Sequence, residues 1–254
     1  MPEPKPHSLA VLVLHGFSGT LESVKALREP LQALGLPVAM PLLAGHGEHS
    51  PEALRGVTWE TWLADAEKAL LQLSNQALQV IVIGHSMGAL LAVQLAYRYP
   101  SLVDSLVLAA PALRIASIFA PGRLFHSIAP IVSRLVKNWR LQSEEDRRNA
   151  VYGDLHYEWV PTKTVLSFFE LVKKTELLLP HITHPALILH CRCDNTVLPE
   201  SAEIAHSSLG SMPAAKSLVW FDKVGHQLFC ATECDRVVQE IVGFVANRLK
   251  GDRS

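Results

Sequence analysis

The stretch Val80-Ile81-Val82-Ile83-Gly84-His85-Ser86-Met87-Gly88 joins an unbroken apolar run to residues 89–99, which favour a helix. A G-x-S-x-G pattern between a strand and a helix predicts a nucleophile elbow, a sharp turn whose serine hydroxyl projects beyond the sheet edge. Glycine is expected two positions before and after the serine, because a Cβ there would collide across the turn. The helix that begins at Met87 would direct free N–H groups and its positive dipole end toward a ligand on Ser86. A turn with an incidental serine would show the same five residues, so the rest of the chain must decide.

Overall composition limits the classes of function. The 254 residues are enough for one large domain, or for one domain with a small insertion. A formal net charge of −1 gives no indication of a nucleic-acid partner. No apolar run approaches the roughly 20 residues of a transmembrane helix, and the proline-rich start shows no signal-peptide cleavage site. We therefore expect a cytoplasmic protein without a transmembrane segment; the oligomeric state stays open.

Apolar runs alternate with helical patterns along most of the chain. This alternation predicts an α/β fold with a mostly parallel sheet and helices on both faces. Helices are expected at residues 21–34, 59–73, 87–99, 200–208 and 233–249. The strands are expected at residues 9–14, 37–40, 80–83, 104–110, 185–190 and 216–221.

Residues 111–184 interrupt this alternation with helical patterns and no convincing strand. The segment is too long for a loop, so we expect a helical cap inserted into a core formed by residues 1–110 and 185–254. Its apolar part could simply pack into the core, or it could line an acyl-binding pocket. The candidate substrate-binding residues are Ile118, Phe119, Phe125 and Ile128.

A serine nucleophile needs a general base, and an acid that orients the base. In nucleophile-elbow proteins the acid and then the histidine follow the serine along the chain. His226 is the candidate base, since it lies in a loop just after a predicted strand, where ligands bind on doubly wound sheets. The candidate acid is Asp194, which follows the strand at 185–190. Asp222 is the rival, but it lies only four residues before His226 on the same loop.

An oxyanion hole needs two N–H groups that are fixed before the reaction. One is expected from Met87, the residue after the nucleophile. The other is expected from Phe17, which lies in the loop after the first strand. His15 is expected to stabilise that turn and to transfer no proton.

The motifs together resemble those of the α/β-hydrolases over nearly the whole chain, and within that fold those of small bacterial carboxylesterases and monoacylglycerol lipases. The resemblance implies Ser86, Asp194 and His226 as a catalytic triad, Phe17 and Met87 as oxyanion donors, a small helical cap and no cofactor. It rests on His15-Gly16-Phe17, Gly45-His46-Gly47, Trp59 with Trp62 and Asp65, Gly84 to Gly88, Asp194 to Val197 with Pro199 and Ser201, and Trp220 to His226.

The expected activity is hydrolysis of carboxylic esters of short to medium acyl chains, with monoacylglycerols as the leading natural substrates. Alternatives on the same fold are thioester, C–C or peptide bond hydrolysis, and a catalytically silent binding protein. Four cysteines, Cys191, Cys193, Cys230 and Cys234, raise the further possibility of zinc. Their C-x-C and C-x-x-x-C spacing is not a standard zinc pattern, so we expect reduced thiols and no metal.

Overall fold

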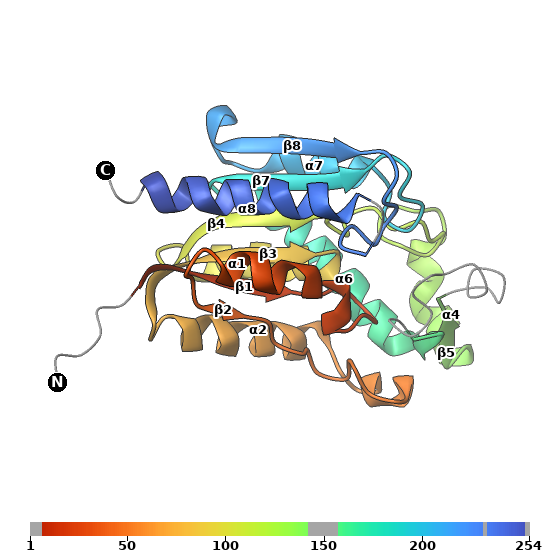
Figure 1. The fold of residues 1–254 in the computed structure, drawn as a ribbon. Helices are drawn as coiled ribbons and strands as arrows, with labels where there is room; N and C mark the ends of the chain where they lie inside the picture. The colour runs from red at the N-terminus through yellow and green to blue at the C-terminus, as the bar shows by residue number, and fades with distance from the viewer. Residues whose placement is uncertain (1–6, 142–156, 231–232, 252–254) are drawn as a thin grey trace.

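The computed structural model describes residues 7–141, 157–230 and 233–251 (Figure 1). Its centre is a six-stranded sheet in which every neighbouring pair is parallel, in the order β2-β1-β3-β4-β7-β8. The expected strands are all present, within a few residues of the predicted ends. They are β1 (His7–Leu14), β2 (Val38–Ala39), β3 (Ala77–His85), β4 (Val103–Ala109), β7 (Ala186–Cys191) and β8 (Lys216–Phe221).

Helices cover both faces of this sheet, as the alternating pattern predicts. On one face, α2 (Trp59–Leu73), α3 (Met87–Arg98), α6 (Thr162–Leu178) and α7 (Glu200–Ser208) share one buried apolar cluster with the strands. On the other face, α8 (Cys234–Gly251) packs with the segment before β2 in a second cluster. The central strands are buried on both faces, which explains why they read as continuous apolar runs.

The expected helix at residues 21–34 is broken into short pieces. Two 3₁₀ turns, η1 (Leu21–Ser23) and η2 (Lys25–Leu27), precede a single short helix, α1 (Arg28–Gln32). Pro30 explains the break, since proline lacks an N–H and is tolerated only in the first turn of an α-helix. By beginning at Arg28, α1 keeps Pro30 within that first turn.

Between β4 and β7 the expectation of no strand is wrong. Two short strands, β5 (Asn138–Arg140) and β6 (Trp159–Pro161), pair in antiparallel register. Three residues are too few for a two-residue periodicity to be visible in a sequence. The described part of this region, which we call the β4–β7 segment (residues 110–141 and 157–185), also contains α4 (Ala129–Leu135) and α6. Figure 1 shows α4 and β5 at the end of the molecule opposite the two termini.

Several hydrogen bonds tie the β4–β7 segment to the rest of the fold. Gln94 of α3 donates a buried hydrogen bond of 3.0 Å to Thr175 of α6. Residues 114–116 run antiparallel to residues 196–198, with N–H···O distances of 2.7 and 2.9 Å. The start of the segment therefore contacts the turn that follows β7. The remaining short helices are η3 (Pro51–Leu54), η4 (His126–Ile128), η5 (Leu179–His181) and η6 (Pro213–Ala215).

Candidate active site

Ser86 lies at the junction of β3 and α3 in a strained backbone conformation, with φ 55° and ψ −114°. A positive φ is costly for a residue with a Cβ and persists only where the surroundings enforce it. Here the backbone around Ser86 is packed so closely that only glycine fits on either side. A Cβ on Gly84 would collide with the Gly88 carbonyl, and one on Gly88 with the Leu14 carbonyl. Ser86 is 6% exposed.

Three side chains form a continuous hydrogen-bonded chain at the carboxyl ends of the strands. His226, in the loop after β8, places Nε2 3.1 Å from the Ser86 Oγ. Its other ring nitrogen, Nδ1, lies 2.8 Å from Oδ2 of Asp194, in the turn after β7. A carboxylate accepts only, so Nδ1 carries the proton and Nε2 is left as an acceptor for the serine hydroxyl. This is the arrangement that a serine needs to become a nucleophile.

Asp194 is held in its ionised form although it is only 3% exposed. Its second oxygen, Oδ1, accepts hydrogen bonds of 2.9 Å from the backbone N–H groups of Thr196 and Val197. Burial alone would raise the pKa of Asp194, but the attraction to His226 and the hydrogen bonds from His226, Val197 and Thr196 together lower it. Asp222, the rival acid, lies at the surface instead and pairs with Arg192 at 3.5 Å.

Two histidines that the sequence reasoning did not assign support this chain from behind. His190 is fully buried at the end of β7, and its Nε2–H donates to the Val197 carbonyl at 3.0 Å. The same nitrogen lies 3.5 Å from Asp194 Oδ2. Burial lowers the pKa of His190, so this ring is neutral. His85 donates from Nε2 to the His226 carbonyl at 2.9 Å, and the two rings are 5.1 Å apart.

The turn after β1 lies directly against the serine. A Cβ on Gly16 would come within 3.1 Å of the Ser86 Cβ. The next turn residue after Phe17, Ser18, has a positive φ of 57°, and its N–H donates to Nε2 of His46 at 3.1 Å. His15, fully buried, accepts at Nε2 from the Leu43 N–H at 3.1 Å. Through these two bonds the histidines fasten the turn to the loop after β2.

The loop after β2 is itself held by hydrogen bonds from α2 and from the β4–β7 segment. Trp62 donates from Nε1 to the Ala44 carbonyl at 3.0 Å, and Asp65 accepts from the Ala44 N–H at 2.8 Å. The Tyr157 hydroxyl donates to the Gly45 carbonyl at 2.9 Å. The Gly45-His46-Gly47 motif, which we call the bracket, therefore holds the turn that carries Phe17 in position.

Comparison with known proteins agrees with this geometry. The family model described as "Serine aminopeptidase, S33" matches residues 5–235. The chain belongs to this family of α/β-hydrolases. The protein is therefore a serine hydrolase, within a group that contains esterases and lipases.

Relatives of this hydrolase include proteins that act on esters. The chain is 30% identical over 207 residues to the thermostable monoacylglycerol lipase of Bacillus sp. strain H-257, covering 80% of this chain and 77% of the relative. It is 25% identical over 248 residues to a carboxylesterase of Bacillus subtilis strain 168, covering 95% and 96%. A solved structure from work on two metagenome-derived lipolytic enzymes, LipS and LipT, superposes with a TM-score of 0.82 at 25% identity, covering 95% of each chain.

The four candidate substrate-binding residues of the hydrolase lie in the β4–β7 segment, outside the hydrogen-bonded chain at Ser86. Phe119 is half-buried and packs edge-on against Trp139, with ring centroids 5.3 Å apart. Ile118, Phe125 and Ile128 are exposed to solvent by 41–59% of their surface. The structure thus shows that three of these four residues are not part of the buried core.

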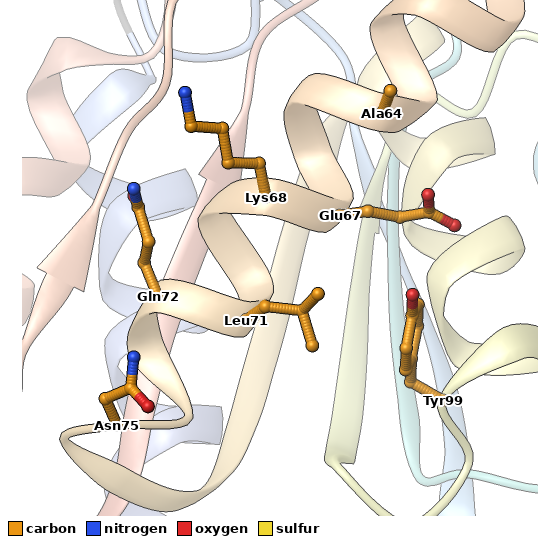
Figure 2. Close-up of a pocket in the computed structure, with 7 residues that line it drawn as sticks. All are labelled: Ala64, Glu67, Lys68, Leu71, Gln72, Asn75 and Tyr99. Atoms are coloured by element: carbon orange, nitrogen blue, oxygen red, sulfur yellow. The ribbon is translucent and has the colours of Figure 1, made fainter.

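A surface hollow on the hydrolase lies far from this site. It is lined along the outer side of α2 by Ala64, Glu67, Lys68, Leu71, Gln72 and Asn75, and by Tyr99 (Figure 2). Tyr99 caps the end of α3 opposite to Ser86, and a helix of this length spans about 18 Å. The hollow therefore has no part in chemistry at Ser86.

In the described part of the chain, every helix is too short or too polar to span a membrane. No group of three or more metal-binding side chains is found there either. All four cysteines are free thiols.

Proposed function

We propose that this hydrolase cleaves carboxylic esters of short to medium acyl chains through an acyl-enzyme on Ser86. The observation that carries the proposal is the chain Ser86–His226–Asp194, with its 3.1 and 2.8 Å hydrogen bonds. In this proposal Ser86 is the nucleophile, His226 the general base and Asp194 the group that orients the base. No cofactor takes part.

In the acylation step, His226 Nε2 takes the Ser86 proton as Oγ attacks the ester carbonyl. The ionised Asp194 keeps the imidazole in the required tautomer and stabilises the imidazolium that forms. The imidazolium then returns the proton to the leaving alcohol. In the second step the same base activates a water molecule, which releases the carboxylic acid and restores the serine.

The negative charge on the carbonyl oxygen is assigned to the backbone N–H groups of Phe17 and Met87. Met87 is the first residue of α3, so its N–H has no acceptor within the helix. Phe17 follows Gly16, and the close approach of Gly16 to Ser86 brings this turn next to the proposed nucleophile. Donors fixed in advance at such positions contribute about 2.7–4 kcal/mol each in hydrolases of this kind.

The proposed acyl group rests on the relatives and on the β4–β7 segment. The similar proteins are named as a monoacylglycerol lipase and a carboxylesterase, which favours monoacylglycerols and simple esters here. The segment provides the apolar side chains of Ile118, Phe119, Phe125 and Ile128, which we assign to the acyl-binding wall of a small cap. Each methylene transferred from water to such a wall contributes about 0.8 kcal/mol.

The test is kcat/KM for p-nitrophenyl and glyceryl esters of increasing chain length, measured with and without EDTA. We expect specificity to rise with acyl length to an optimum and then to fall, with no effect of EDTA. A best substrate with an acetyl group would overturn the fatty-acyl assignment. Because the family model is described as an aminopeptidase, aminoacyl p-nitroanilides are the matched control; faster turnover of these amides than of every ester would replace the ester proposal.

A further inference from the structure

Two thiols lie in contact next to the proposed catalytic acid. The Cys191 and Cys193 sulfur atoms are 2.8 Å apart. Cys191 ends β7 and is fully buried in the second apolar cluster, whereas Cys193 is exposed. Asp194 follows immediately, and the mechanism proposed above uses neither thiol.

The backbone brings the two thiols together. The Asp194 N–H donates to the Cys191 carbonyl at 3.2 Å, which closes a turn over residues 191–194. Cys191 itself is fixed, because it pairs with Phe221 of β8 in the central sheet. A disulfide requires Cα atoms about 4.4–6.8 Å apart. Two residues separated by a single residue span at most about 7 Å even in an extended chain, and less in a turn.

Cys193 also contacts the loop that carries the base. Its sulfur accepts a hydrogen bond from the backbone of Gly225, the residue before His226. The turn at 191–194 and the loop at 225–226 therefore meet at this sulfur. We therefore expect a displacement of Cys193 to reach both partners of the Asp194–His226 hydrogen bond.

We propose that Cys191 and Cys193 are a thiol-oxidation site, at which a hydroperoxide forms a reversible disulfide that slows ester turnover by displacing Asp194. The inference rests on the proposed function of Asp194. The Cys193 thiolate attacks the hydroperoxide oxygen, giving a sulfenic acid and the alcohol or water. The Cys191 sulfur then attacks that sulfenic sulfur and releases water, so two thiols lose two electrons and two protons to one hydroperoxide.

Bond formation must move the turn. A disulfide bond is about 2.05 Å long, shorter than the present separation of the two sulfurs by most of an ångström. Because Cys191 is held in the sheet, we expect the exposed Cys193 to make this movement and to carry the adjoining Asp194 with it. A misplacement of about 1 Å in catalytic geometry can cost up to about 10²-fold in rate, and we expect a loss of that order.

Reaction should be slow at neutral pH. Although the residue is exposed, partial desolvation of its sulfur and then the hydrogen bond with Cys191 raise the pKa of the Cys193 thiol above its ordinary value. The thiolate is the reacting form, so oxidation should accelerate as the pH becomes alkaline.

The experiment treats the full-length protein with hydrogen peroxide at mildly alkaline pH and follows ester turnover, free thiols and intact mass. We expect the loss of two thiols and the mass of two hydrogen atoms, a peptide map that links residues 191 and 193, and recovery of turnover with dithiothreitol. Untreated protein reports the proposed esterase function separately. If it hydrolyses no ester, that function fails, while mass and thiol counts still decide whether the disulfide forms.

Variants separate this pair from other oxidisable groups. Cys230→Ser/Cys234→Ser should respond like the wild type, since the pair is intact. Cys193→Ser should keep its untreated turnover, form no internal disulfide and lose no activity reversibly; Cys191→Ala gives the same test from the other thiol. The proposal is overturned if no 191–193 link forms, if the link forms without loss of turnover, or if Cys193→Ser is inactivated as fast as the wild type.

Discussion

The surroundings of Ser86 and the β4–β7 segment differ in how their side chains are held. Asp194 is 3% exposed and accepts hydrogen bonds at both carboxylate oxygens, while Leu124 in the segment is 87% exposed. The first region buries polar groups, and each of them therefore needs a hydrogen-bond partner at a defined position. The second exposes large apolar groups, which require only a ligand or a surface to cover them. We therefore propose that the first region determines the rate and the second the choice of substrate.

The largest effect should come from Ser86→Ala. The hydroxyl forms the acyl-enzyme, and loss of a triad nucleophile costs on the order of 10⁶ in kcat. The fold should be intact by circular dichroism and thermal unfolding, because the alanine keeps the Cβ that the elbow already accommodates. Near-normal turnover by pure Ser86→Ala protein would show that the rate does not arise from this region.

Next in size should be Asp194→Asn, with Asp222→Asn as its matched control. An amide in place of the carboxylate favours the wrong His226 tautomer, which costs roughly 10⁴ in kcat. Asp222 is exposed and pairs with the exposed Arg192 at 3.5 Å, so its variant should retain turnover within a few-fold. Steady-state kinetics on both proteins decides; the reverse ranking would move the acid to the loop after β8.

A third effect should follow from His46→Ala. This change removes the acceptor of the Ser18 N–H and frees the turn that presents Phe17. We expect kcat to fall by about 10²-fold, with a smaller change in KM, because a displaced oxyanion donor affects the transition state most. His49→Ala, at an exposed position of the same loop, is the control. Equal kcat values for the two variants would remove the role of the bracket.

The buried His190 predicts a pH effect on stability. Its pKa is lowered in the folded state, so between about pH 6.5 and that lower value the unfolded chain binds a proton that the folded chain does not. Stability then falls as pH falls, by at most about 1.4 kcal/mol per pH unit for this group. Denaturant unfolding from neutral to mildly acid pH should show a shallower decline in His190→Gln than in the wild type. An unchanged slope would mean that His190 protonates equally in both states.

The smallest effects should come from Phe125→Ala and Ile128→Ala in the β4–β7 segment. Both residues are exposed, so the free energy of unfolding should change by less than about 1 kcal/mol. If they line the acyl wall, selectivity per added methylene should weaken by up to about fourfold and the chain-length optimum should shift. An unmoved optimum would leave the wall without evidence and return substrate choice to other residues.

The elements that could be predicted from the sequence are those in which the residue pattern directly causes the local structure. Buried parallel strands must be apolar throughout, and the elbow needs glycine on both sides of its serine, so β3 and Gly84 to Gly88 are visible directly. Chain order selected Asp194 over Asp222, and the structure places Asp194 against His226. The predicted helix at residues 21–34 is too long, because the leucine spacing alone does not take into account the backbone N–H that Pro30 lacks.

Contacts between distant segments could not be predicted. His85 and His190 lie at the ends of apolar strands. Their partners, the carbonyls of His226 and Val197 respectively, become neighbours only when the sheet forms. His46 belongs to a motif that the resemblance included without a role; its bond to Ser18 joins positions 28 residues apart. The β5–β6 pair consists of three-residue strands, which are too short for a two-residue alternation to be recognised.

The most direct test of the central claim is covalent labelling with a fluorophosphonate, followed by intact mass and peptide mapping. The account predicts one adduct per chain of the wild type, located on Ser86, with loss of ester turnover in proportion to labelling. Ser86→Ala should take up no label under the same conditions. Labelling at a different residue, or ester turnover that continues after Ser86 is fully modified, would contradict the account.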